Sequence, residues 1–278
     1  MAEKTKIAWC HHTFNPWWGC AHVSGGCEHC YAESKALRWG FNIWGADAPR
    51  RFLGRATWEQ PRKWNARAEQ AGERRRVFCG SMCDVFEDRE QLEIPRHHLF
   101  EIIADTPWLD WLLLTKRPEN MTILTPRSWR DGWPQNVWAL ATVENQGVAA
   151  QRIGHLLKVP ATIRGLSCEP LLGSLDVSDC TLPNGASCHP LRVEGGNYPL
   201  SGMVHRLNWI IVGSESGRYR RPCNLDWVRD LIAQARAAGV PVFVKQLEVN
   251  GRVEIDPRRW PEDLRIQEFP KSEGTLVP

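Results

Sequence analysis

Residues 77–116 contain three runs, V-F-C-G-S-M-C-D at 77–84, E-Q-L-E-I-P-R-H-H-L-F-E-I-I-A at 90–104 and W-L-L-L-T-K at 111–116. The first and third runs open with short, nearly continuous apolar sequences, which are typical of strands buried on both faces of a sheet. The middle run has the periodicity of an amphipathic helix. A strand, a helix and a second strand in this order predict a βαβ unit with parallel strands.

The same alternation continues toward both ends of the chain. Further strands are predicted at 137–142, 163–167, 209–212 and 241–244, with helices at 31–38, 147–157 and 225–238 and a first strand within 7–14. We therefore predict an α/β fold, a partial or closed βα (TIM-like) barrel of six to seven parallel strands. An open doubly wound sheet is the alternative. The length of 278 residues fits a single barrel domain over 1–278.

Three segments depart from this alternation. We expect an Arg/Trp-rich insertion at about 41–75, a Gly/Pro-rich insertion at 176–207 and a Pro-punctuated C-terminal tail at 247–278. The second insertion is longer than most loops of compact domains, which indicates a role of its own. The first groups arginines with tryptophans, so nucleic acid is a candidate partner through phosphate contacts and base stacking. A solvated helix face whose tryptophans cap the barrel is the alternative.

Composition indicates a cytoplasmic protein without a membrane segment. There is no run of 18 apolar residues, and the N-terminus lacks the apolar stretch of a signal peptide. Thiols stay reduced in the cytoplasm, so the ten cysteines favour metal binding or reactivity over a disulfide framework. The net charge of +3 is too small to predict nucleic-acid binding by itself.

Cysteines are concentrated in residues 15–32, which read N-P-W-W-G-C-A-H-V-S-G-G-C-E-H-C-Y-A. Cys20, Cys27 and Cys30 fall within eleven residues. Three sulfur ligands in one short loop are typical of a soft metal ion or an iron–sulfur cluster. Because structural zinc sites close themselves with four protein ligands, three cysteines predict a centre with an open position.

Polar residues follow nearly every predicted strand. They are Asp84, Lys116, Arg117, Glu144, Glu169, Ser214, Glu215, Lys245 and Gln246. The carboxyl ends of barrel strands meet at one mouth, so these side chains are expected to surround an active site. Any one of them alone could equally be a solvated loop residue or a helix cap.

The chain as a whole carries a resemblance to a known superfamily. The matching pieces are N-P-W-W-G-C at 15–20, G-C-E-H-C-Y-A at 26–32, G-S-M-C-D at 80–84, L-T-K-R-P at 114–118, E-P-L-L-G at 169–173, G-S-E-S-G at 213–217 and K-Q at 245–246. The three-cysteine loop after the first strand resembles the cluster motif of radical SAM enzymes, although its first gap is six residues instead of three. More closely, residues 9–246 resemble a family of uncharacterised three-cysteine phage and bacterial proteins.

The resemblance implies two cofactors and an electron donor. Cys20, Cys27 and Cys30 would bind three irons of a four-iron four-sulfur (4Fe-4S) cluster, and S-adenosyl-L-methionine would chelate the fourth iron. Reduction by a donor such as a flavodoxin or ferredoxin would cleave this cofactor to a radical that abstracts hydrogen from the substrate. By the same resemblance, the cofactor-binding positions are Gly80, Ser81, Met82, Asp84, Lys116, Thr142, Glu144, Glu169, Ser214 and Glu215.

Two further cysteines are candidate catalytic residues. Cys83 and Cys168 lie at the predicted mouth, where a thiol could donate a hydrogen atom to a substrate radical. The alternative is that each is a small buried hydrophobic residue.

The resulting hypothesis is a radical SAM enzyme with an unknown substrate, for which nucleic acid or a nucleobase derivative is the candidate class. One alternative is a nucleic-acid-binding module without catalysis, in which His11, His12 or His22 completes a Cys3His zinc site. Another is an interaction protein of a phage or defence system that uses the barrel as a scaffold.

Overall fold

A computed structural model of the chain describes residues 5–181, 185, 187–191 and 206–271. Its centre is an eight-stranded sheet in the order β1-β4-β5-β6-β7-β10-β11-β12. The strands are β1 (His12–Phe14), β4 (Arg75–Cys79), β5 (Leu109–Thr115), β6 (Val137–Thr142), β7 (Ile163–Cys168), β10 (Trp209–Gly213), β11 (Val242–Val249) and β12 (Arg252–Glu254). All neighbouring strands pair in parallel except β11 and β12, which are antiparallel.

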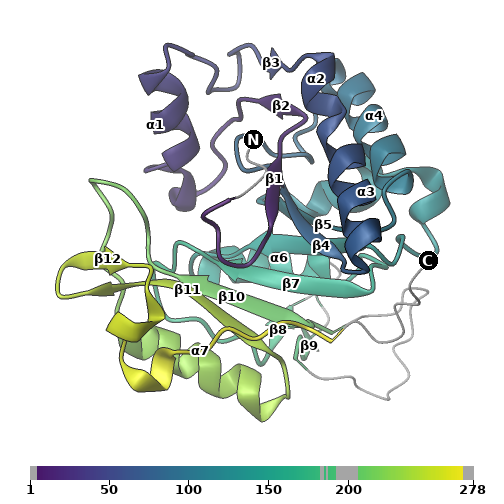
Figure 1. Ribbon diagram of the computed structural model, residues 1–278. Helices are drawn as coiled ribbons and strands as arrows, with labels where there is room; N and C mark the ends of the chain where they lie inside the picture. The colour runs from purple at the N-terminus through teal and green to yellow at the C-terminus, as the bar shows by residue number, and fades with distance from the viewer. Residues whose placement is uncertain (1–4, 182–184, 186, 192–205, 272–278) are drawn as a thin grey trace.

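The sheet curls into a half-barrel (Figure 1). The expectation of a mixed α/β fold with a partial barrel is therefore confirmed. The sheet has eight strands instead of the expected six to seven: seven pair in parallel, and an antiparallel strand is added at one edge. The additional antiparallel strand β12 comes from the segment that we expected to be a tail, where a short polar sequence gives little strand signal.

Helices connect most of the parallel strands, and all of them except α1 (Tyr31–Arg38), which packs beside the cysteine loop, pack on one face of the sheet (Figure 1). They are α1 (Tyr31–Arg38), α2 (Arg55–Trp58), α3 (Gln60–Ala71), α4 (Glu93–Ala104), α5 (Met121–Leu124), α6 (Gln146–Leu156) and α7 (Leu225–Ala237). The side chains of Asn145 and Asn224 cap α6 and α7 by accepting backbone N–H bonds. Two small antiparallel pairs, β2 (Trp17–Trp18) with β3 (Arg51–Phe52) and β8 (Cys180–Thr181) with β9 (Ser187–Cys188), lie outside the main sheet.

Aromatic side chains fill the other face of the sheet. Trp209 is central there, with edge-on contacts to Trp138 and Phe243 at ring-centroid distances of 5.8 and 6.2 Å. Phe269 packs against Trp209 and Phe243. The C-terminal segment therefore helps to fill the half-barrel instead of forming a detached tail, and it also buries Trp260 in the larger core.

Part of the Arg/Trp-rich segment also packs in the core. Trp58 stacks on His98 and Trp64 on His12, with both tryptophans buried. Arg50 lies beneath the surface in an ion pair with Glu87. These residues support the fold, as in the alternative of tryptophans that cap the barrel. The expected 176–207 insertion falls largely outside the described residues. In the part of the chain that is described, no helix is long and apolar enough to cross a membrane.

His11 makes stability depend on pH. Its Nδ1 accepts a hydrogen bond of 2.8 Å from the backbone N–H of Arg76, which requires an unprotonated Nδ1. Burial, followed by the charges of Arg76 and Arg75, lowers the pKa of His11 from 6.5 to about 4. The unfolded chain therefore binds a proton that the folded chain does not, and folding is progressively disfavoured as pH falls from about 6.5 to 4.

We expect the free energy of unfolding to decline across this pH window and to decline less steeply in His11→Asn. Urea denaturation at a series of pH values measures both slopes. Part of the slope persists in the variant, because burial also lowers the pKa of His12 to about 4. Equal slopes in the two proteins would contradict this role of His11.

Candidate functional site

A cavity of about 300 Å³ opens at the carboxyl ends of the parallel strands. Cys20, Cys27 and Cys30 all line it. The strand-end residues that line it with them are Gly80, Ser81, Cys83, Asp84, Thr115, Lys116, Arg117, Thr142, Ser167, Glu169, Glu215, Ser216 and Lys245. The fold thus brings the cysteine loop and most of the predicted mouth residues to one concave site, as is usual for ligand sites of α/β folds.

Besides Gln246, whose buried side chain donates to the Ser214 carbonyl (2.7 Å), four of the predicted site residues lie behind the cavity wall. Met82 belongs to a small cluster with Ala32 and Trp44, and Cys168 is in the large core next to the helices. Ser214 is buried and accepts a hydrogen bond from the backbone N–H of Glu248. The fourth is Glu144, whose side chain is buried and acts on the cysteine loop as described below.

Local geometry fixes both ends of the cysteine loop. Gly19 has a φ of 109°, and a Cβ there would lie 2.4 Å from the carbonyl oxygen of Ile43, so only glycine fits. Cys20 then forms an isolated β-bridge with Trp44. At the other end, Cys30 is the N-cap residue of α1, and the hydroxyl of Tyr31 donates to the carbonyl of Ser81 (2.8 Å).

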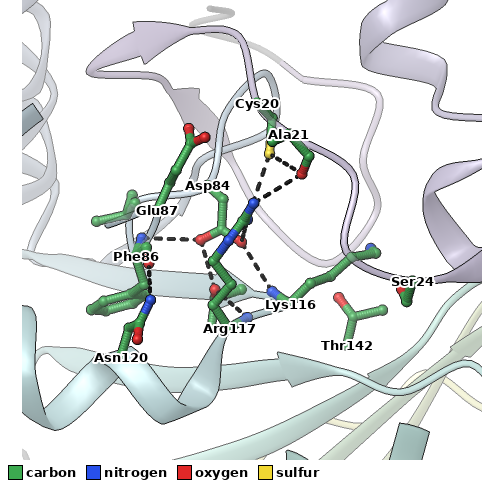
Figure 2. A network of polar contacts seen from close by, with 12 residues as sticks. Cys20, Ala21, Ser24, Asp84, Phe86, Glu87, Lys116, Arg117, Asn120 and Thr142 are labelled. Atoms are coloured by element: carbon green, nitrogen blue, oxygen red, sulfur yellow. Dashed lines mark hydrogen bonds and ion pairs between the residues drawn. The ribbon is translucent and has the colours of Figure 1, made fainter. Parts of the chain in front are cut away.

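Asp84 and Arg117 hold the first cysteine (Figure 2). Asp84 accepts hydrogen bonds from the Thr115 hydroxyl (2.6 Å), from the backbone N–H groups of Phe86 (3.0 Å) and Lys116 (3.1 Å), and from Arg117 Nη1 (2.9 Å). These donors occupy both carboxylate oxygens, so Asp84 also serves to position Arg117.

Arg117, held in place by Asp84, in turn contacts the cysteine loop. Its Nη2 donates to the Ala21 carbonyl (2.9 Å), and its Nη1 lies 3.7 Å from Cys20 Sγ. Burial alone lowers the pKa of Arg117, but the neighbouring Asp84 and Cys20 outweigh it, so that the pKa is raised. A permanently charged guanidinium beside the Cys20 sulfur lowers the cost of forming its thiolate.

Glu144 holds the middle of the loop. Its Oε1 accepts from the Ser24 hydroxyl (2.8 Å), and Arg152 Nη1 lies 3.2 Å from both of its oxygens. The carboxylate lies directly against Gly26, where an added Cβ would come within 2.3 Å of Glu144 Oε1. A side chain at Gly26 would therefore push the segment before Cys27 away from the wall.

We expect Gly26→Ala to destabilise the protein by roughly 1–3 kcal/mol, the usual cost of overpacking. Gly25→Ala is the matched control, because the nearest atom to its added Cβ is Arg221 Nη1 at 3.9 Å. Urea denaturation compares the two variants with the parent protein. Equal stability of the two variants would show that the contact with Glu144 does not constrain the loop.

Arg221 makes a third set of contacts with the cysteine loop. The sequence did not identify it as a site residue. Arg221 donates to both oxygens of Glu215 (2.5 and 3.0 Å), to Glu28 (2.8 Å) and to the Gly25 carbonyl (2.9 Å). His29 Nδ1 lies 3.1 Å from Glu215 Oε2. Burial opposes ionisation of Glu215, but the bonds from Arg221 and His29 outweigh it and lower its pKa. The loop after β10 is thereby joined to the cysteine loop.

The three cysteines are outside any disulfide and are buried or half-buried. The eight cysteines whose side chains are described are all free. Burial raises the pKa of Cys20 to about 12 and also raises that of Cys30, so both are neutral thiols at neutral pH. Binding of a metal group here would therefore release protons. No group of three or more His, Cys, Asp or Glu side chains within the described ranges is placed to hold a single metal ion.

Comparisons with known proteins identify the family. A search of curated proteins and a search of solved structures each gave no match. A family model described as "Protein of unknown function (DUF5131)" matches residues 4–264, which is most of the chain and includes the cysteine loop and the strands that surround the cavity. The chain therefore belongs to the DUF5131 family.

Proposed function

We propose that the protein is a radical SAM enzyme that binds a 4Fe-4S cluster through Cys20, Cys27 and Cys30 and S-adenosyl-L-methionine in the adjoining cavity. The observation that carries this proposal is that all three thiols line the same cavity as the strand-end polar side chains. When bound and reduced, the cluster and its ligand supply a radical that abstracts hydrogen. The chain supplies the orientation of both groups and limits access of water.

The donor set fits a cluster better than a single zinc ion. A four-iron cluster takes one cysteine on each of three irons when its fourth iron binds another ligand, whereas a structural zinc ion takes four protein ligands. Three thiols line the cavity. The histidines of the zinc alternative have other contacts: His22 lies 2.7 Å from Glu33, and His11 accepts from the Arg76 amide.

The rest of the cavity offers groups suited to S-adenosyl-L-methionine. Lys116 and Lys245 are cations that could neutralise its carboxylate, and Glu169, whose Oε1 pairs with Lys245, could accept bonds from its ammonium or ribose hydroxyls at Oε2. Trp9 and Phe78 provide apolar lining for the adenine. We expect Asp84 to contribute less to this binding than Lys116, Lys245 and Glu169, because both of its oxygens already accept hydrogen bonds from the protein.

Cys83 is the better placed of the two candidate hydrogen donors. It lines the cavity, whereas Cys168 lies in the core behind it. Burial raises the pKa of Cys83 well above its usual value, which keeps its S–H bond intact. If the thiol donates its hydrogen atom to a substrate radical, Cys83→Ala alters the product. An unchanged product would remove this role.

The decisive experiment is anaerobic purification and cluster reconstitution, followed by incubation with S-adenosyl-L-methionine and dithionite. The proposal requires a brown protein whose visible absorbance is bleached by dithionite and which forms 5′-deoxyadenosine, detected by mass spectrometry. A colourless protein with stoichiometric zinc and no 5′-deoxyadenosine would contradict the radical SAM proposal and support the zinc-binding module instead.

A further inference from the structure

A cluster of aromatic rings and cations lies beside the cysteine loop. We call it the aromatic–basic face and define it as Trp18, Lys35, Trp39, Phe41 and Arg51. Trp39 stacks on Trp18 with ring centroids 5.3 Å apart, and Phe41 meets Trp18 edge-on at 6.1 Å. The Arg51 guanidinium lies over Phe41 (4.3 Å) and Trp18 (4.9 Å), and the Lys35 ammonium lies over Trp39 (4.8 Å).

This face differs from the other arginine and tryptophan clusters in its exposure. Trp39 is 48% exposed, and Lys35 is exposed as well. In contrast, Trp58 and Trp64 are buried, and Arg74 is held by Asp110 at 2.7 Å. Two further large apolar side chains, Leu37 of α1 and Phe52 of β3, are 53% and 49% exposed, and grouped exposed apolar side chains are typical of contact surfaces.

The residues around the face add positive charge. Arg38 at the end of α1 and Arg55 at the start of α2 are both exposed, and the side chain of Arg55 is 93% exposed although it lies 3.9 Å from Glu59. A polyanion is therefore the complementary ligand. Aromatic rings add the ability to stack with planar groups, and the two together are the usual means of binding single-stranded nucleic acid. Paired bases keep their faces inside the duplex, so a duplex could use only the charges.

The face is continuous with the cavity. Trp18 and Phe41 pack on the same small cluster as Cys20 and Cys30, and Trp44 of that cluster lines the cavity. Helix α1 begins at the cavity with Tyr31 and ends beside Trp39. A strand that stacks on Trp39 would thus run toward the cysteine loop.

We propose that the aromatic–basic face binds single-stranded nucleic acid and delivers a nucleotide of that strand to the cavity as the substrate. The binding step stands on the face alone. The delivery step rests on the proposed radical SAM function. A base that stacks on Trp39 takes the place of the Lys35 ammonium, which then contacts a neighbouring phosphate.

Fluorescence anisotropy of the full-length protein tests the binding step. The probes are a labelled oligothymidylate of about 20 nucleotides, which exceeds a typical site size, an abasic strand of the same length and a duplex. We expect the oligothymidylate to bind most tightly. Trp39→Ala should weaken its binding roughly tenfold, the effect of losing one base–aromatic stack. Lys35→Ala should reduce the slope of log affinity against log salt by about 0.7.

Control experiments distinguish binding at this face from non-specific attraction to positive charge and from the effects of misfolding. Arg258→Ala removes an exposed arginine outside the face and should leave the affinity unchanged. Circular dichroism checks that Trp39→Ala is folded, and the exposed Lys35 provides a test that does not depend on packing. The proposal is overturned if the oligothymidylate does not bind at low salt, if the abasic strand or the duplex binds as tightly, or if folded Trp39→Ala retains full affinity.

The binding assay needs neither a cluster nor S-adenosyl-L-methionine, so the two proposals can fail separately. Formation of 5′-deoxyadenosine without oligothymidylate binding would leave the radical SAM function and remove the nucleic-acid face. Binding without 5′-deoxyadenosine would leave the face and remove the delivery step. Oligothymidylate binding together with 5′-deoxyadenosine formation supports both.

Discussion

Replacement of Cys27 by alanine is expected to abolish incorporation of iron into the reconstituted protein and to lower 5′-deoxyadenosine formation by more than about 100-fold. Even residues that only support metal ligands change affinity or activity by roughly 10–100-fold when they are replaced. Loss of one of three sulfur ligands should exceed that range. Iron and sulfide analysis together with mass spectrometry measure both quantities.

Cys223→Ala is the matched control for this prediction. Cys223 and Cys27 are each 8% exposed, but Cys223 belongs to the large core and does not line the cavity. Its replacement should leave the iron content unchanged. Full iron content and activity in Cys27→Ala would show that the cysteine loop does not hold the cluster. Equal losses in both variants would point to general destabilisation.

The sheet could be predicted because its strands are buried on both faces. Runs such as W-L-L-L-T at 111–115 have no polar face, and only parallel strands covered on both sides account for them. The C-terminal segment carried no such signal. Arg252–Glu254 is too short and polar, and Trp260 depends on tertiary contacts for its burial. The place of the C-terminal segment in the fold could therefore not be predicted from hydrophobic periodicity.

Adjacent residues of one loop can point into the cavity or away from it, and sequence alone does not show which of them line it. Ser81 and Cys83 line the cavity, whereas Met82 between them turns away into the cluster below α1. Arg221 was missed because its role comes from contacts across 193 and 196 residues of sequence, to Glu28 and Gly25. Irregular loops have no period from which such partners follow.

The spacing of apolar residues in the Arg/Trp-rich segment indicates which of them are buried, although its composition alone suggests a nucleic-acid surface. Pro61, Trp64 and Ala68 are spaced as one face of a helix, and all three are buried in α3. That spacing distinguishes a core face from a nucleic-acid surface. The exposed aromatic–basic face instead combines Lys35, Trp39 and Phe41, which are close in the sequence, with Trp18 and Arg51, which are 33 residues apart and are brought together by the pairing of β2 with β3.

Arg50→Ala is expected to lower the free energy of unfolding by roughly 3–5 kcal/mol, because it leaves the buried Glu87 without its counter-charge. The Arg50 side chain is 0% exposed and donates to both oxygens of Glu87 (2.9 and 2.5 Å). It also donates to the carbonyls of Ala48 (2.8 Å), Gly45 (3.1 Å) and Ile43 (3.2 Å). Urea denaturation of the variant and its parent gives the difference.

A double variant shows whether the loss comes from the unpaired charge or from the loop. Arg50→Met with Glu87→Leu removes both charges and retains apolar volume, which is often neutral for a buried pair. If the charge dominates, the double variant recovers most of the stability lost in Arg50→Ala. If the carbonyl contacts dominate, the loss persists, because residues 43–48 then lack their donor and Trp44 no longer holds its bridge to Cys20. A loss no larger than that of Arg258→Ala, which breaks an exposed pair, would contradict both explanations.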